Sequence, residues 1–166
     1  TAARTGLPAV RPLCLVEPED PEGWQLTDQY FLGPSLWVAP VVEEGSRSRR
    51  AYLPRGTWID WWSGERVAGG CWIEAAAPLE RIPIWVRAGS LVLTYAAETV
   101  ARGLGDDDPR RAIEATLWGE PPLGRARADL PAGTVVRWLG GDWTSRWSPK
   151  HKKKGALASL GAEEAR

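Results

Sequence analysis

The segment from Tyr52 to Glu65, YLPRGTWIDWWSGE, predicts a strand, a tight turn and a second strand. The turn is Pro54-Arg55-Gly56, because proline fixes one backbone angle and glycine adopts angles that other residues avoid. After the turn the side chains alternate with a period of two, as a strand requires. One face carries Trp58, Asp60 and Trp62, and the other carries Thr57, Ile59 and Trp61. Both faces bear tryptophan, so we expect a strand over residues 57–62 that is covered on both sides.

Short runs of strand character recur on either side of this segment, and most are bounded by proline or glycine. The predicted strands are Leu36–Val42, Arg50–Leu53, Cys71–Ala75, Ile84–Arg87, Leu91–Tyr95, Ile113–Trp118, Arg125–Leu130, Val135–Leu139 and Trp143–Trp147. Residues 28–33 are ambiguous and are interpreted as a helical turn. The polar residues 96–111 are interpreted as a linker or long loop, and residues 148–166 as a frayed tail. Short strands at this spacing favour a β-sandwich or barrel.

The composition excludes several kinds of function. The 166 residues include 11 Trp but one His, and Lys+Arg and Asp+Glu balance at 21 each. The single His151 lies in a Lys-rich run, which argues against histidine-rich zinc sites and a Ser-His-Asp mechanism. Zero net charge argues against nucleic acid as the main partner, and no apolar run is long enough to span a membrane. The absence of any Met predicts that this is a segment of a longer protein.

The residues alone reveal no self-sufficient active site. Asp28, Asp60, Glu74 and Glu80 are candidate carboxylates, but no spacing pairs them as glycoside hydrolysis requires. Asp106–Asp108 lacks the alternation of a calcium loop, so we expect no metal site, and no phosphate loop or cofactor motif is found. Cys14 and Cys71 are interpreted as small buried thiols, with a disulfide left open. Arg87, in an apolar strand, needs a carboxylate or carbonyl partner if it is buried.

Four segments, in order, resemble the C-terminal part of glycoside hydrolase family 31, the α-glucosidase and α-xylosidase group. They are TGLPAVRPL (5–13), DQYFLGPSLWVAPVVEEG (28–45), YLPRGTWIDWWSGE (52–65) and APLERIPIWVRAGS (77–90). The resemblance covers residues 5–93. It implies a mostly β chain, with an antiparallel β-sandwich and a small second β-domain, preceded by a remnant of a (β/α)₈ barrel. The implied domains are the barrel remnant at 1–27, the proximal sandwich at 28–94, an abbreviated distal β-domain at 95–149 and a flexible tail at 150–166.

The resemblance also implies a retaining hydrolase of α-linked sugars that uses two aspartates in an upstream barrel. No residue here matches either aspartate motif, so we expect no catalytic residue and no activity from this chain alone. Its expected partners are the upstream barrel of the same protein and, through that barrel, an α-linked oligosaccharide. The candidate substrate contacts are Arg11 and Glu17, on the segment nearest the barrel's active-site end, and the tryptophans Trp61 and Trp62.

A second hypothesis is a free-standing carbohydrate-binding module. Trp58, Asp60, Trp61 and Trp62 would form a platform on which a sugar ring stacks, with the carboxylate binding its hydroxyls. A third hypothesis is a β-rich interaction domain without sugar contact. The first residues show no secretory pattern, so a cytoplasmic location is favoured while the localisation stays open.

Overall fold

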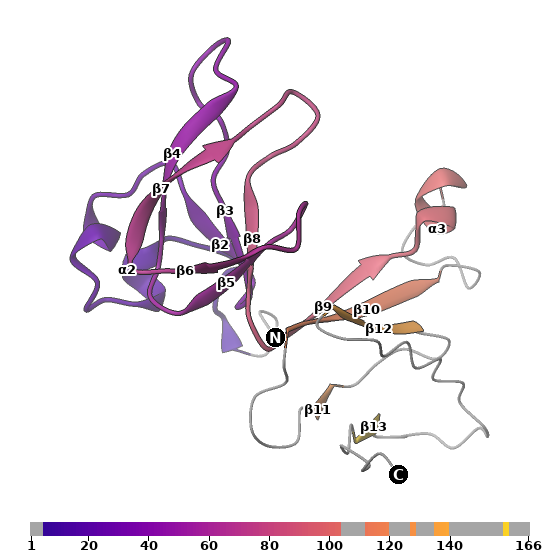
Figure 1. The fold of residues 1–166 in the computed structure, drawn as a ribbon. Helices are drawn as coiled ribbons and strands as arrows, with labels where there is room; N and C mark the ends of the chain where they lie inside the picture. The colour runs from indigo at the N-terminus through magenta and orange to yellow at the C-terminus, as the bar shows by residue number, and fades with distance from the viewer. Residues whose placement is uncertain (1–4, 104–111, 120–126, 129–134, 140–157, 160–166) are drawn as a thin grey trace. The chain divides into compact units, whose positions relative to one another are not determined.

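The computed structural model describes residues 5–103, 112–119, 127–128, 135–139 and 158–159. The chain divides into two compact units, Thr1–Ala88 and Gly89–Arg166, which are described separately. Figure 1 shows the strands of each unit. Within the described residues, no helix has the length and apolar character needed to cross a membrane.

The first unit contains a six-stranded sheet and a two-stranded ribbon. The sheet has the order β1-β2-β3-β8-β5-β6, with every neighbouring pair antiparallel. Its strands are β1 (Val10–Arg11), β2 (Tyr30–Leu32), β3 (Leu36–Val38), β8 (Ile84–Arg87), β5 (Thr57–Asp60) and β6 (Arg66–Ala68). The ribbon pairs β4 (Ser48–Leu53) with β7 (Cys71–Ala76), also antiparallel. Two short helical segments, α2 (Leu13–Val16) and η1 (Pro21–Trp24), lie between β1 and β2 in the sequence.

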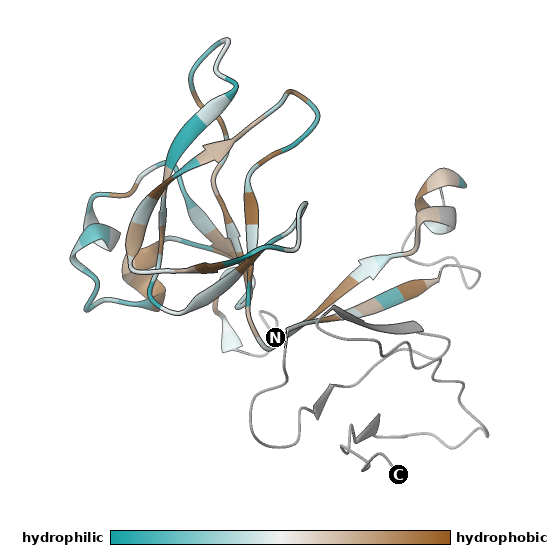
Figure 2. Ribbon diagram, in the orientation of Figure 1, coloured by the Kyte–Doolittle hydropathy of each residue, from teal (hydrophilic) through white to brown (hydrophobic). Residues whose placement is uncertain are grey.

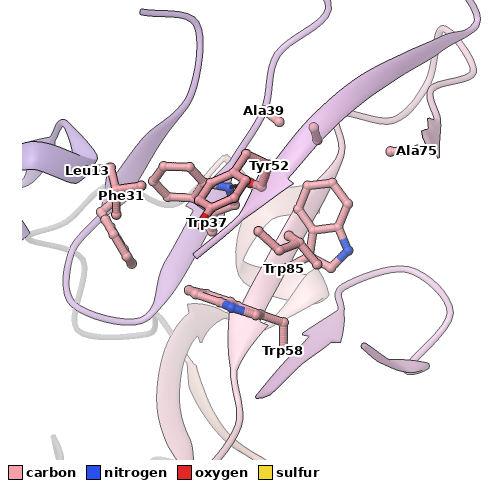
Figure 3. Packing of buried hydrophobic residues seen from close by; sticks show 10 residues of the cluster. Leu13, Phe31, Trp37, Ala39, Tyr52, Trp58, Ala75 and Trp85 are labelled. Carbon is pink, nitrogen blue, oxygen red and sulfur yellow. Dashed lines mark hydrogen bonds between the residues drawn. The ribbon is translucent and has the colours of Figure 1, made fainter. Parts of the chain in front are cut away.

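A cluster of buried aromatic residues joins the sheet to the ribbon (Figure 3). Trp37, Trp58 and Phe31 come from the sheet and are fully buried, whereas Tyr52 comes from the ribbon. The Trp37 indole N–H donates to the Tyr52 carbonyl oxygen at 2.7 Å, which ties β3 to β4. Phe31 meets the Trp37 ring edge-on, with centroids 4.8 Å apart. Two layers around one apolar core confirm the predicted antiparallel β-sandwich.

The second unit is built on a three-stranded sheet of order β12-β10-β9. Its strands are β9 (Ser90–Tyr95), β10 (Ile113–Trp118) and β12 (Val135–Leu139). β9 runs antiparallel to β10, whereas β12 runs parallel to it. A helix, α3 (Ala97–Ala101), follows β9, and a pair of two-residue strands, β11 (Arg127–Ala128) and β13 (Ala158–Ser159), forms a separate ladder.

Several sequence predictions require correction. Residues 28–33 contain strand β2 and not a helical turn, because Phe31 fits its ring between the core tryptophans. The strand predicted at 36–42 ends at Val38, shortly before Pro40, which lacks a backbone donor. Residues 96–111 contain helix α3, whose Thr99 hydroxyl accepts the Ala112 N–H at 2.8 Å.

Among the remaining predictions, some strands are confirmed, whereas the predictions for the tail and the cysteines require correction. Ile84–Arg87, Ile113–Trp118 and Val135–Leu139 are strands with the predicted bounds. Of the strand predicted at 125–130, the described residues Arg127–Ala128 form β11, and the predicted tail contains β13. Trp143–Trp147 lies outside the described residues. Both cysteines are free thiols, and Cys71 is exposed, so the interpretation of two buried thiols is wrong.

The division between the two units falls between Ala88 and Gly89, whereas the sequence suggested a boundary after residue 94. The difference concerns β9, which pairs along its whole length with β10 of the second unit. A boundary after residue 94 would separate these two paired strands.

Candidate functional site

The tryptophan strand ends earlier than its sequence alternation predicted. β5 stops at Asp60, and Trp61 and Trp62 lie in the turn that follows. The Asp60 Oδ1 atom accepts the backbone N–H of Trp62 at 2.8 Å and that of Ser63 at 2.7 Å, and it also accepts the Ser63 hydroxyl. An aspartate that binds the backbone ahead of it favours a turn over a continued strand.

The predicted sugar platform is therefore only partly assembled. Trp58 is fully buried and donates its indole N–H to the Pro54 carbonyl oxygen at 2.7 Å. Trp62 is 44% exposed, donates to the Ile82 carbonyl oxygen at 2.8 Å and lies beneath the Arg81 guanidinium, 5.4 Å from the ring centroid. Trp61 is half-buried. The structure thus leaves Trp62, but not Trp58, with a solvent-facing ring.

The predicted partner of Arg87 is present. Its guanidinium donates to the Glu17 carboxylate at 2.6 Å and lies 4.9 Å from the Trp58 ring centroid and 5.5 Å from that of Phe31. Cation–π contacts of this kind stabilise a guanidinium that is partly removed from water. Glu17, a candidate substrate contact, therefore forms an ion pair within the chain and fixes the segment that follows α2.

Arg11, the other candidate on this segment, lies in β1 opposite Phe31. Its Nε donates to the Pro8 carbonyl oxygen at 2.7 Å. The contacts of Arg11 and Glu17 bind their segment to itself and to the sandwich.

A buried carboxylate–phenol pair was missed in the sequence. Tyr52 donates its hydroxyl to Asp20 Oδ2 at 2.8 Å, and Asp20 Oδ1 caps η1 by accepting the Glu22 N–H. Burial, with the hydrogen bond to Asp20 and its negative charge, raises the pKa of Tyr52 to about 12. The phenol therefore stays protonated and acts as a donor. The signal available was Asp20-Pro21, an N-cap residue followed by proline at the first helical position.

A second ion pair fixes the start of β4. Arg49 donates to the Asp28 carboxylate at 2.7 Å and to the carbonyl oxygens of Asp28 and Pro40. Asp28, a candidate carboxylate in the sequence, thus forms an ion pair within the chain. Together these contacts tie the start of β4 to Pro40, in the loop after β3, and to Asp28, just before β2.

The outward side of the β4–β7 ribbon carries a polar and aromatic row that the sequence analysis did not single out. The register places Arg50 opposite Glu74, and Tyr52 opposite Trp72. Arg50 lies over the Trp72 ring at 4.6 Å from its centroid, and the Ser48 hydroxyl donates to Glu74. The first half of β4 is correspondingly hydrophilic in Figure 2.

Five carboxylates of the first unit serve structural bonds. Glu17, Asp20, Asp28, Asp60 and Glu74 each accept a hydrogen bond or form an ion pair within the unit. Within the described residues, no three His, Cys, Asp or Glu side chains are grouped so that they could hold a metal ion. The geometry is that of a scaffold, with exposed aromatic rings at Trp24, Trp62 and Trp72.

Comparison with known proteins identifies this scaffold. Residues 6–92 match the glycosyl hydrolase family 31 C-terminal domain. The chain belongs to glycosyl hydrolase family 31. The matched residues agree to within one residue at each end with the range 5–93 that the sequence motifs indicated. The matched part is the C-terminal domain of that family.

Similar proteins in family 31 are much longer than this chain. The α-glucosidase 2 of Bacillus thermoamyloliquefaciens is 36% identical over 91 residues, which are 55% of this chain and 12% of that protein. A dextranase of Flavobacterium johnsoniae, solved with glucose, is 33% identical with a TM-score of 0.65 over 76% of this chain and 15% of its own. An α-xylosidase from a soil metagenome, solved with xylose, is 48% identical with a TM-score of 0.53 over 54% of this chain and 13% of its own. This chain thus spans between 12% and 15% of these three proteins.

Proposed function

We propose that this chain acts as the C-terminal support of a family 31 enzyme that hydrolyses α-glycosidic bonds, with the catalytic barrel supplied by the same protein. One observation carries the proposal: the family match is confined to the C-terminal domain, and the carboxylates named above serve structural bonds. A retaining glycosidase needs two carboxyl groups about 5–5.5 Å apart across the scissile bond. In this proposal the barrel supplies both groups.

Its physical role is to hold the chain segment that leaves the barrel. Leu13 is fully buried within the sandwich core, and Glu17 pairs with Arg87 of β8. The segment 11–17 is thus held to the sandwich by one apolar contact, at Leu13, and by one ion pair, at Glu17. The active site of such barrels lies at the C-terminal ends of the strands, so a fixed exit segment would steady one part of its rim. Arg11 and Glu17 remain the proposed approaches to substrate, although both already have partners within the chain.

The proposal predicts that the isolated chain does not hydrolyse an aryl α-glucoside or an aryl α-xyloside. The measurement is release of the aryl alcohol, with buffer alone as the blank and a full-length family 31 α-glucosidase as the positive control. We expect release no faster than in the blank. Turnover that stays with the protein through a second, unrelated purification step would contradict the proposal.

The second candidate function is a carbohydrate-binding module, which the exposed ring of Trp62 favours. In that case Trp61 and Trp62 would contact the sugar, with Arg81 beside them. Affinity electrophoresis in gels containing an α-glucan separates the two functions. Retardation that disappears in Trp61→Ala or Trp62→Ala would favour the module at this turn.

A further inference from the structure

The outer face of the β4–β7 ribbon is defined here by Ser48, Arg50, Trp72 and Glu74. All four residues are exposed, whereas their neighbours Ala51, Leu53 and Ala75 on the opposite side of the ribbon are buried in the core. The antiparallel register brings the two strands' outward residues side by side. The outer face is therefore a continuous surface in which one indole ring adjoins hydroxyl, guanidinium and carboxylate groups.

A hollow adjoins this face at the start of β4. It has a volume of about 140 Å³, well above the roughly 10–15 Å³ of such space that one water molecule needs. Its lining includes Ser48 and Arg50 of the outer face, together with Asp28, Glu43 and Ser46. Since Arg50 also lies over the Trp72 ring, the hollow and the indole are two parts of one surface.

We propose that the outer face and this hollow bind a short oligosaccharide. A pyranose ring presents weakly polar C–H groups on its faces and hydroxyls around its edge. The Trp72 ring, 36% exposed, offers a rigid surface against which these C–H groups can pack. The neighbouring hydroxyl, carboxylate and guanidinium groups provide hydrogen-bond acceptors and donors for the sugar hydroxyls.

The mixture of charges separates this ligand from two others. The lining carries the carboxylates of Glu43 and Asp28 and the guanidinium groups of Arg49 and Arg50, and Asp28 is already paired with Arg49. With Glu74 beside Arg50, this surface has no excess of positive charge that would select a phosphate or another anion. A metal ion is not favoured either, because the described residues contain no group of three side chains that could hold one. A neutral ligand rich in hydroxyls fits the mixture of donors and acceptors.

The length of the face indicates more than one sugar ring. In the register Trp72 lies opposite Tyr52, which is four residues from Ser48 along β4. At about 3.3 Å per residue, about 13 Å along the ribbon therefore separates the levels of Ser48 and Trp72. One ring would stack on Trp72, and the next would reach the hollow lined by Ser48. In the unliganded chain the Arg50 guanidinium lies over the Trp72 indole. A bound sugar ring would take the place of this guanidinium on the indole. The displaced guanidinium would then donate hydrogen bonds to the sugar hydroxyls.

This inference goes beyond the supporting role, and only the choice of α-linked probes rests on the proposed function. The test is isothermal titration calorimetry of the whole chain with maltotriose and isomaltotriose, with cellotriose as the β-linked comparison. Trp72→Ala is the principal variant, and Trp72→Phe keeps a smaller aromatic ring. Trp24→Ala and Trp62→Ala remove exposed indoles at other places on the unit, and a thermal melt of each variant shows that it is folded.

We expect saturable binding of at least one trisaccharide, weakened about tenfold or more by Trp72→Ala and less by Trp72→Phe. Trp24→Ala, at an exposed indole with no proposed sugar contact, should leave the affinity unchanged. Binding that survives in folded Trp72→Ala, or that is lost in Trp62→Ala instead, would overturn the assignment, as would no binding of any of the three sugars. Preferential binding of cellotriose would support the proposed site but contradict the proposed function in an α-glycosidase. Catalysis by the chain alone would contradict the supporting role and would not bear on this site.

Discussion

Gly69→Ala is expected to lower the free energy of unfolding by about 3 kcal/mol or more. A Cβ atom at this position would lie 1.9 Å from the Pro54 carbonyl oxygen and 2.8 Å from Trp58 Nε1. Those two atoms are hydrogen-bonded to each other at 2.7 Å, so neither can move away without breaking a buried bond. The backbone cannot withdraw easily either, because Gly69 N–H donates to Gly56 and Gly70 N–H donates to Leu53.

The matched control for this variant is Gly45→Ala. Gly45 has φ +77° and nothing within 4 Å of its built Cβ, so alanine there meets only the backbone cost of about 1–2 kcal/mol. Urea unfolding followed by tryptophan fluorescence measures both variants against the parent chain. A loss at Gly69 no larger than the loss at Gly45 would show that the Pro54–Trp58 contact does not confine this turn.

Trp37→Ala is expected to cost about 3–5 kcal/mol, as truncation of a buried aromatic side chain usually does. Trp37 is fully buried, and its ring and N–H reach both Phe31 of the sheet and Tyr52 of the ribbon. Trp37→Phe should cost less, because it keeps part of the packing but leaves the Tyr52 carbonyl without this donor, a loss of about 1–3 kcal/mol.

The same urea titrations supply the comparison for Trp37. Trp24 is 69% exposed, so Trp24→Ala should change the free energy of unfolding by about 0.5 kcal/mol or less. If Trp37→Ala were as mild as Trp24→Ala, the two layers would not depend on the tryptophan that joins them. A Trp37→Phe loss as large as that of Trp37→Ala would assign the effect to the hydrogen bond and not to packing.

The sequence predicted those parts of the fold that depend on local pattern. Pro54-Arg55-Gly56 forms the expected turn, with Gly56 at φ +125°. The need of Arg87 for a carboxylate was also deduced correctly, since it follows from the cost of burying a charge. The identity of that partner was beyond local reasoning, because Glu17 lies seventy residues earlier in the chain.

The errors arose where a side chain bonds across the fold or to its own backbone. Phe31 makes a strand of an ambiguous segment through its contact with Trp37, which no local pattern reveals. Asp60 ends its strand by accepting the N–H groups ahead of it, although tryptophan alternation continues beyond it. The Trp72 surface was missed because it requires the register of β4 against β7, which brings residues about twenty positions apart into one row.

The central claim, that this chain serves as the C-terminal support of a larger α-glycosidase, is tested most directly by reading the coding DNA immediately upstream of Thr1. The account predicts an open reading frame, continuous with residue 1, that encodes a barrel of about 250 residues with two aspartates at the ends of its strands. A stop codon followed by a start signal at Thr1 would contradict the account, because the chain would then act without a catalytic barrel in the same protein.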